Sequence, residues 1–107
     1  MISVYLEEVK DALFPRKNGV LTKRSRYIRI EPLRPYTKDE IRTLRLRLHL
    51  SVSLFAELLG VSSKTVEAWE SGHNEPSGPA LRMMNMIQRY PDLLIESHTV
   101  YITGSAR

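Results

Sequence analysis

The fold of this chain is decided by residues 55–72, which read FAELLGVSSKTVEAWESG. The pattern predicts two short helices with a tight turn between them at Gly60, because glycine readily adopts the left-handed backbone that ends a helix. Ser62 is a favoured first cap for the second helix, and Gly72 ends it. Two helices joined in this way form the unit with which proteins place a helix in the major groove of DNA.

The flanking sequence predicts further helices around this unit. Thr37 and Glu40 form a capping box that starts a helix ending at about His49. Ser51 caps the helix that contains Phe55. Together the predicted helices cover residues 37–49, 51–59, 62–72, 76–90 and 93–97. The fold class is therefore all-α, with five helices.

One stretch carries conflicting signals. Residues 44–50 alternate leucine with polar side chains at period two, which also fits a strand. The capping box at Thr37 and the acidic side chains of Asp39 and Glu40 favour a helix, because acidic residues stabilise a first turn.

The segment before residue 37 has a different character. Residues 3–13 predict an amphipathic helix, with Tyr5, Leu6, Val9 and Leu13 on one face. Tyr27, Ile28, Arg29 and Ile30 alternate like a strand, and prolines follow at positions 32 and 35. We therefore divide the chain into an extension (1–36), a helical domain (37–98) and a tail (99–107). Residues 99–103 are rich in strand formers and fit either an edge strand or a loose tail.

The positive charge is concentrated in the extension. The chain carries a net charge of +4. Residues 1–36 hold eight basic and four acidic side chains, whereas residues 37–96 hold seven and eight. A basic arm of this kind binds DNA phosphate, docks on an acidic protein, or is simply solvated, and the sequence leaves these three alternatives open.

Composition excludes several classes of protein. There are no cysteines, so the chain has neither disulfides nor thiolate metal sites. His49, His73 and His98 are too widely spaced to form a ligand set, and no catalytic constellation appears. We expect no cofactor, no metal and no enzymatic activity. The chain has no apolar run long enough to span a membrane and no signal peptide, so we expect a cytoplasmic protein with no membrane partner.

The second helix of the decisive unit has two distinct faces. Val66, Trp69 and Glu70 point one way and anchor the helix on its neighbours. The other face carries small and polar side chains suited to a groove, namely Lys64, Glu67, Ala68 and Ser71, with Ser63 at its N-terminal edge. Candidates for contacts with the DNA backbone are Ser51, Ser53, His73 and Asn74. The alternative is an ordinary helical bundle in which this face is plain surface.

Over residues 37–90 the sequence resembles the Cro/C1-type (XRE) helix-turn-helix family. The match includes Leu50-Ser51, Phe55-Ala56, Leu59-Gly60-Val61-Ser62, Thr65-Val66, Trp69-Glu70, Gly72 and Pro76 in order. The resemblance implies a lambda-repressor-like domain. It assigns base contacts to Ser63, Lys64, Glu67 and Ala68, and capping or backbone roles to Ser62 and Thr65. It also implies a structural ion pair between Arg45 and Glu70. Val52 departs from the family, whose members often carry a phosphate-binding glutamine there.

A narrower resemblance covers residues 69–91. The motif Trp69-Glu70-x-Gly72, followed by Pro76, Gly78-Pro79-Ala80-Leu81, Met83-Met84, Met86-Ile87, Arg89 and Pro91, is similar to the HigA-like antitoxins of bacterial toxin–antitoxin operons. This likeness implies a dimeric repressor of its own operon that neutralises a ribonuclease toxin of the RelE class. Residues 1–36 would then bind the toxin, through Tyr5, Leu6, Val9, Leu13, Tyr27, Ile28 and Ile30.

Apolar side chains spread around more than half of the helix 76–90. One small core cannot cover so wide a stripe, so we expect a homodimer face formed by Met83, Met86, Ile87 and Tyr90. The alternative is that the extension folds back over this stripe. A phage or mobile-element repressor without a toxin, and an interaction adaptor that has lost DNA binding, remain competing functions.

Overall fold

The computed structural model describes residues 29–103, and the chain divides into two units, Met1–Pro32 and Leu33–Arg107. Every described helix belongs to the second unit. The helix predicted over residues 3–13, with Tyr5, Leu6, Val9 and Leu13, lies outside the described residues, and so do Tyr27 and Ile28. Ile30 is described; it is exposed and not part of a strand.

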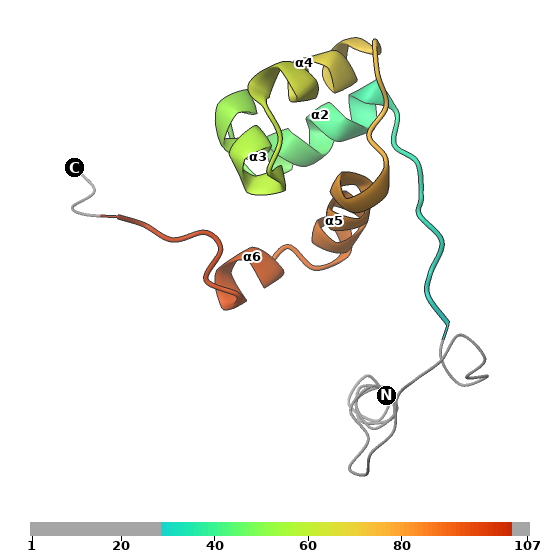
Figure 1. Cartoon of the computed structure of the whole chain (residues 1–107). Coiled ribbons are helices and arrows are strands. Elements are labelled where there is room, and N and C mark those ends of the chain that lie inside the picture. Colours follow the sequence, from blue (N-terminus) through green and yellow to red (C-terminus); the bar gives the residue numbers. More distant parts are fainter. Residues whose placement is uncertain (1–28, 104–107) are drawn as a thin grey trace. The chain divides into compact units, whose positions relative to one another are not determined.

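The second unit is an arrangement of helices, and the prediction of an all-α domain is confirmed. Five helices follow one another in the described part of the chain: α2 (Lys38–Arg47), α3 (Val52–Leu59), α4 (Ser63–Ser71), α5 (Gly78–Arg89) and α6 (Leu93–Glu96) (Figure 1). Residues 29–103 contain no strand.

Local capping explains where the first three of these helices begin. The Thr37 hydroxyl accepts from the Glu40 amide at 3.2 Å, and the Glu40 carboxylate accepts from the Thr37 amide at 2.9 Å. This capping box also holds the pKa of Glu40 below its ordinary value, chiefly through the bond from the Thr37 backbone. The hydroxyls of Ser51 and Ser62 cap α3 and α4 in the same manner, each at 3.1 Å.

The conflicting signal over residues 44–50 is resolved as a helix and a turn. Leu44 is buried, whereas Leu46 is 53% exposed, so the leucines do not share one face as they would in a strand. The helix stops at Arg47, and His49 takes a positive φ of 59° that turns the chain toward α3.

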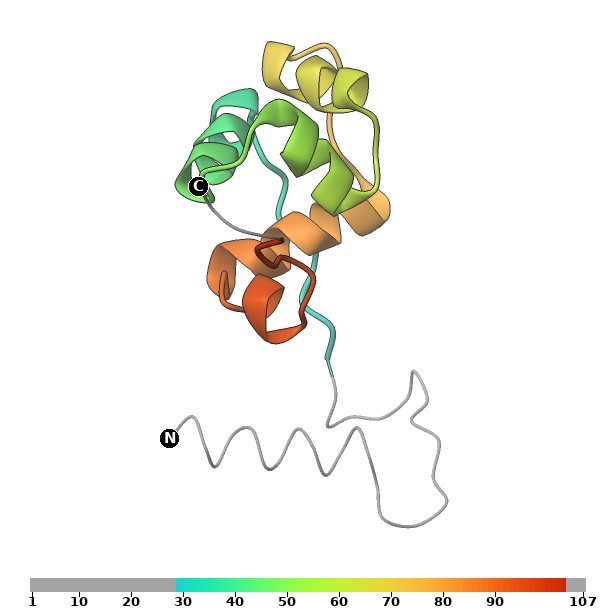
Figure 2. The same cartoon turned by 90° about the vertical axis from the view of Figure 1, so that its left-hand side faces the viewer.

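The core forms where α2, α3, α4 and α5 converge. Figures 1 and 2 show α3 and α4 lying against α2, with α5 on the other side of α2 and α3. The side chains with at most 1% of their surface exposed are Ile41, Phe55, Val66, Met84 and Ile87. Because each of these four helices contributes at least one of them, α4 is fixed by tertiary packing as well as by its caps.

The boundary of the helical domain lies before the predicted position. The residues 33–37, which we call the strap, belong to the second unit, so the division falls between Pro32 and Leu33 and not after residue 36. Tyr36 is 7% exposed and its hydroxyl donates to the Met84 carbonyl at 3.4 Å. The Arg34 amide donates to Asn85 Oδ1 at 2.8 Å, and Asn85 Nδ2 donates to the Arg34 carbonyl at 3.1 Å.

Arg34 adds a second attachment between the strap and α2. Its Nη2 lies 2.7 Å from Glu40 Oε2, and its guanidinium carbon lies 4.6 Å from the centre of the Tyr36 ring. Burial raises the pKa of the Tyr36 hydroxyl. These contacts explain why the strap packs with the helices although it has no regular secondary structure of its own.

The described part of the tail is not a strand. The amides of Thr99 and Val100 both donate to the Leu94 carbonyl at 3.0 Å, which closes α6. Tyr101 and Ile102 follow with 71% and 84% of their surface exposed. The sequence allowed either an edge strand or a loose tail over residues 99–103, and the structure has a tail without regular secondary structure.

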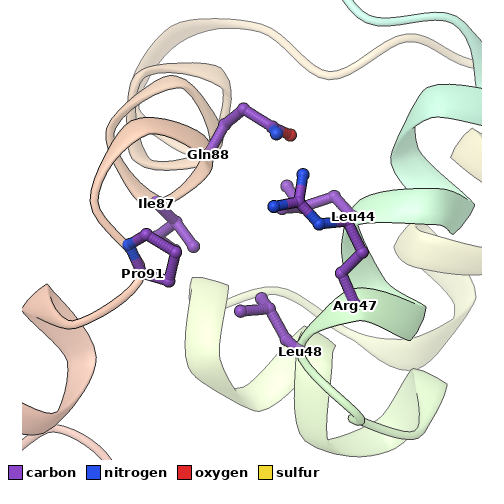
Figure 3. A pocket seen from close by; sticks show the side chains of 6 residues that line it. All are labelled: Leu44, Arg47, Leu48, Ile87, Gln88 and Pro91. Atoms are coloured by element: carbon purple, nitrogen blue, oxygen red, sulfur yellow. The ribbon is translucent and has the colours of Figure 1, made fainter.

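The prediction for Ile87 is wrong. This side chain has no exposed surface, because it points from α5 into the core, and it cannot belong to an exposed dimer face. Figure 3 shows its position, at a small hollow where Leu44 and Arg47 of α2 and the following Leu48 face Ile87 and Gln88 of α5 and Pro91. Met83, Met86 and Tyr90 are 37%, 47% and 45% exposed.

We expect Gly60→Ala to lower the free energy of unfolding by about 1–2 kcal/mol. Gly60 has φ 74°, and no atom lies within 4 Å of the position that a Cβ would take, so the cost comes from the backbone alone. Gly60→Asn should lose less, since asparagine tolerates the left-handed region better. Urea denaturation of the three proteins measures the order, and an alanine variant as stable as wild type would contradict it.

Candidate nucleic-acid interface

Helix α4 presents a polar face away from the core. Val66 and Trp69 are buried on its inner side, and Glu70 is largely covered. On the outer side Lys64, Glu67 and Ser71 are exposed, while Ser63 and Ala68 are half-buried. The structure thus groups on one side of α4 the side chains to which the family resemblance assigns base contacts.

The start of α4 is closed by a pair of hydroxyls. Ser62 Oγ accepts from the Thr65 amide and also lies 2.9 Å from Thr65 Oγ1. Within the described chain no hydrogen bond engages the amides of Ser63 and Lys64. Ser62 and Thr65 therefore fix the first turn, and the free amides beside them point out of the helix end, where an anion is favoured.

A two-pronged ion pair holds α4 at a fixed angle to α2. Arg45 Nε donates to Glu70 Oε2 at 2.7 Å, and Arg45 Nη2 donates to Glu70 Oε1 at 3.0 Å. Each side chain is only 12% exposed. The hydrogen bond to Glu70 raises the pKa of Arg45 above its ordinary value, so the guanidinium stays charged.

The same guanidinium also reaches the turn before α3. Arg45 Nη1 donates to the Leu50 carbonyl at 3.1 Å, and Leu50 is followed by Ser51, the N-cap of α3. One side chain therefore joins α2, the start of α3 and the last turn of α4. The family resemblance implied the pairing of Arg45 with Glu70, which is confirmed, but nothing in the sequence indicated the contact with the Leu50 carbonyl.

The start of α3 offers the second group of backbone-contact candidates. Ser51 and Ser53 are exposed. Val52, which stands where the family often has glutamine, is half-buried and packs against the core. The structure thus gives Val52 a packing position, and the polar groups left at this helix start are Ser51, Ser53 and the helix amides.

The turn after α4 contains the remaining candidates. The Gly72 backbone has φ 86°, and the amides of His73 and Asn74 both donate to the Ala68 carbonyl, at 2.9 and 3.3 Å. Ser71 Oγ donates to the same carbonyl at 3.1 Å and lies 2.7 Å from His73 Nδ1. Because the Ser71 proton is used in that bond, the geometry suits a His73 ring that carries its proton on Nδ1. His73 and Asn74 are exposed.

The described residues show no other kind of functional site. Residues 29–103 hold no cluster of three or more His, Asp or Glu side chains that could bind a metal ion. No helix in this part of the chain is long and apolar enough to cross a membrane.

Comparison with known proteins agrees with this geometry. A helix-turn-helix family profile matches residues 41–84, which span α2 to the middle of α5. Antitoxin HigA-2 of Vibrio cholerae is 33% identical over 90 residues, which cover 81% of this chain and 86% of that protein. The chain belongs to the Cro/C1-type (XRE) helix-turn-helix family. Its members bind DNA and are not enzymes.

Within this family the chain resembles the HigA-type antitoxins. It also resembles an uncharacterized HTH-type transcriptional regulator, YiaG of Escherichia coli K12, with 43% identity over 54 residues. That match covers 50% of this chain and 56% of YiaG. The match to HigA-2 extends well beyond the length of the helix-turn-helix profile.

Removing one member of the ion pair should cost much more than removing both. We expect Arg45→Met to lower the free energy of unfolding by about 3 kcal/mol, because the Glu70 carboxylate then stays covered without a partner. The double variant Arg45→Met/Glu70→Met should recover a large part of this loss. A double-mutant cycle by urea denaturation measures the coupling, and strictly additive losses would contradict the prediction.

Proposed function

We propose that this protein is a sequence-specific transcriptional repressor that reads operator DNA with the outer face of α4. The observation that carries the proposal is the two-pronged Arg45–Glu70 pair, which holds this polar face at a fixed angle to the rest of the domain. Ser63, Lys64, Glu67 and Ala68 take the base contacts. Ser51, Ser53, Ser62, Thr65, His73 and Asn74 cap the helices or contact the DNA backbone.

We propose further that the protein acts as the antitoxin of a toxin–antitoxin pair and represses its own operon. The similarity to HigA-2, which covers most of both chains, supports this assignment. The partner would be a ribonuclease toxin of the RelE class, and the cytoplasm, where operator DNA and RNA meet, is the compartment in which the complex would act. Residues 1–36 are the proposed toxin-binding segment.

A homodimer completes the proposal. Two copies related by a two-fold axis would present two α4 helices to half-sites about one helical turn apart. Met83, Met86 and Tyr90 on the outer side of α5 form the proposed contact. Tyr90 is held in place there, because its hydroxyl donates to the Glu96 carboxylate and this bond raises its pKa.

The DNA assignment is tested with Lys64, the one basic side chain on the outer face of α4. Lys64→Glu should weaken binding to the DNA upstream of the gene by about 1–3 kcal/mol and change the preferred base at one position of each half-site. Selection of bound sequences from a random pool, followed by affinity measurement, gives both results. Arg47→Glu, an exposed change on α2 that also lowers the net charge by two, is the control for an effect of charge alone. Unchanged sequence preference in Lys64→Glu would argue against base contacts by α4.

The antitoxin assignment is tested in the extension. Where a small basic protein is encoded beside this one, we expect Tyr5→Ser/Leu6→Ser/Val9→Ser to abolish co-purification with it and to restore growth arrest by it. DNA affinity of the triple variant should equal that of wild type. Co-purification that survives the substitutions would remove residues 5–9 from the toxin-binding segment, and a neighbour that causes no arrest would favour the stand-alone repressor.

A further inference from the structure

Lys38, the first residue of α2, lies beside the last turn of α4. A Cβ placed on Gly72 would lie 3.5 Å from Lys38 Cδ, so the aliphatic stem of the lysine rests against the glycine that ends α4. Figure 1 shows the start of α2 next to the turn that follows α4. Because 3.5 Å is an ordinary van der Waals distance, the lysine stem passes close to the Gly72 backbone without depending on the absence of a side chain there.

The position of Lys38 in its own helix is electrostatically unfavourable. The first turn of a helix carries the positive end of the macrodipole, which disfavours a cation there. The capping box joins the Thr37 and Glu40 amides to the Glu40 carboxylate and the Thr37 hydroxyl, and the lysine side chain takes no part in it. The ammonium of Lys38 is therefore available to a partner outside α2.

The ammonium group of Lys38 has no counter-ion in the described chain. Arg34 pairs with Glu40 and Arg45 with Glu70, whereas no carboxylate among residues 29–103 pairs with Lys38. Lys38 is exposed and lies next to the turn that contains His73 and Asn74. A lysine whose stem lies along protein surface keeps its ammonium in water, where it can bind an anion.

We propose that Lys38, whose stem lies beside the Gly72 backbone at the end of α4, is a phosphate-contacting residue of the DNA interface. This inference rests on the proposed binding of DNA by α4. Lys38 contacts the sugar–phosphate backbone beside the bases read by the outer face of α4. It adds affinity without sequence preference and fixes the register of the domain on the duplex.

The test measures how DNA affinity depends on salt. Fluorescence anisotropy with a labelled duplex of mixed sequence gives the affinity of the full chain between ~50 and ~200 mM salt. Lys38→Gln should reduce the slope of log affinity against log salt by about 0.9, the value for one phosphate contact. Lys38→Arg should restore the slope, because it restores the charge at the end of a similar stem.

A matched control lies on the same helix. Arg47 is exposed at the other end of α2, beside the hollow toward α5 (Figure 3), and Arg47→Gln removes the same charge away from α4. We expect its salt slope to equal that of wild type. Equal slopes for wild type and Lys38→Gln, or equal reductions in the two glutamine variants, would overturn the proposal.

Thermal unfolding separates a structural effect from a binding effect. If Lys38 only stabilised the end of α4, Lys38→Gln would lower the melting temperature and leave the salt slope unchanged, which would also overturn the proposal. A wild-type chain that bound no DNA would contradict the proposed function itself. Normal binding by wild type with an unaltered slope in Lys38→Gln would contradict only the assignment of Lys38.

Discussion

The geometry of the candidate interface depends on a single guanidinium. Arg45 donates to both carboxylate oxygens of Glu70 and to the Leu50 carbonyl, so it joins three segments that are separate in the sequence. A covered ion pair of this kind contributes little net stability, because desolvation offsets much of the attraction. What it fixes is orientation, since two parallel hydrogen bonds allow little rotation of α4 about α2. A helix that enters the major groove of DNA requires a fixed orientation, because the groove is little wider than the helix.

Local sequence signals account for most of the helical framework. Thr37, Ser51 and Ser62 start three helices with their own hydroxyls, and Gly60 and Gly72 end two of them in the left-handed region. These effects act within a few residues, so they can be predicted from a single sequence. The alternation of leucines over residues 44–50 was resolved correctly because the capping box outweighs a period-two pattern.

The errors came from contacts between distant residues. On α5 the apolar side chains cover so wide a stripe that their spacing does not tell which of them face inward. Leu81, Met84 and Ile87 follow each other at intervals of three, and these are the side chains of α5 that are buried in the core. The sequence places the strap in the extension, because the contact that attaches it to the helices joins Arg34 to Asn85. These residues are 51 positions apart, and no local pattern reports such a contact. The sequence does contain a signal that the strap packs on α2. Tyr36 stands directly before the N-cap Thr37 and Ile41 is the fourth residue of the helix, which is the spacing of a hydrophobic staple.

The Asn85 amide bonds the Arg34 backbone in the way one strand bonds another, with one donor and one acceptor. Because Asn85 also donates to the Leu81 carbonyl, the strap is tethered to a helix turn that is itself packed in the core. A pull on the extension would therefore be transmitted to α5 through Asn85 and to α2 through Glu40. Traction by any body attached to the extension would load the helix that carries Met83 and Met86 together with α2, and it would reach α4 only through them.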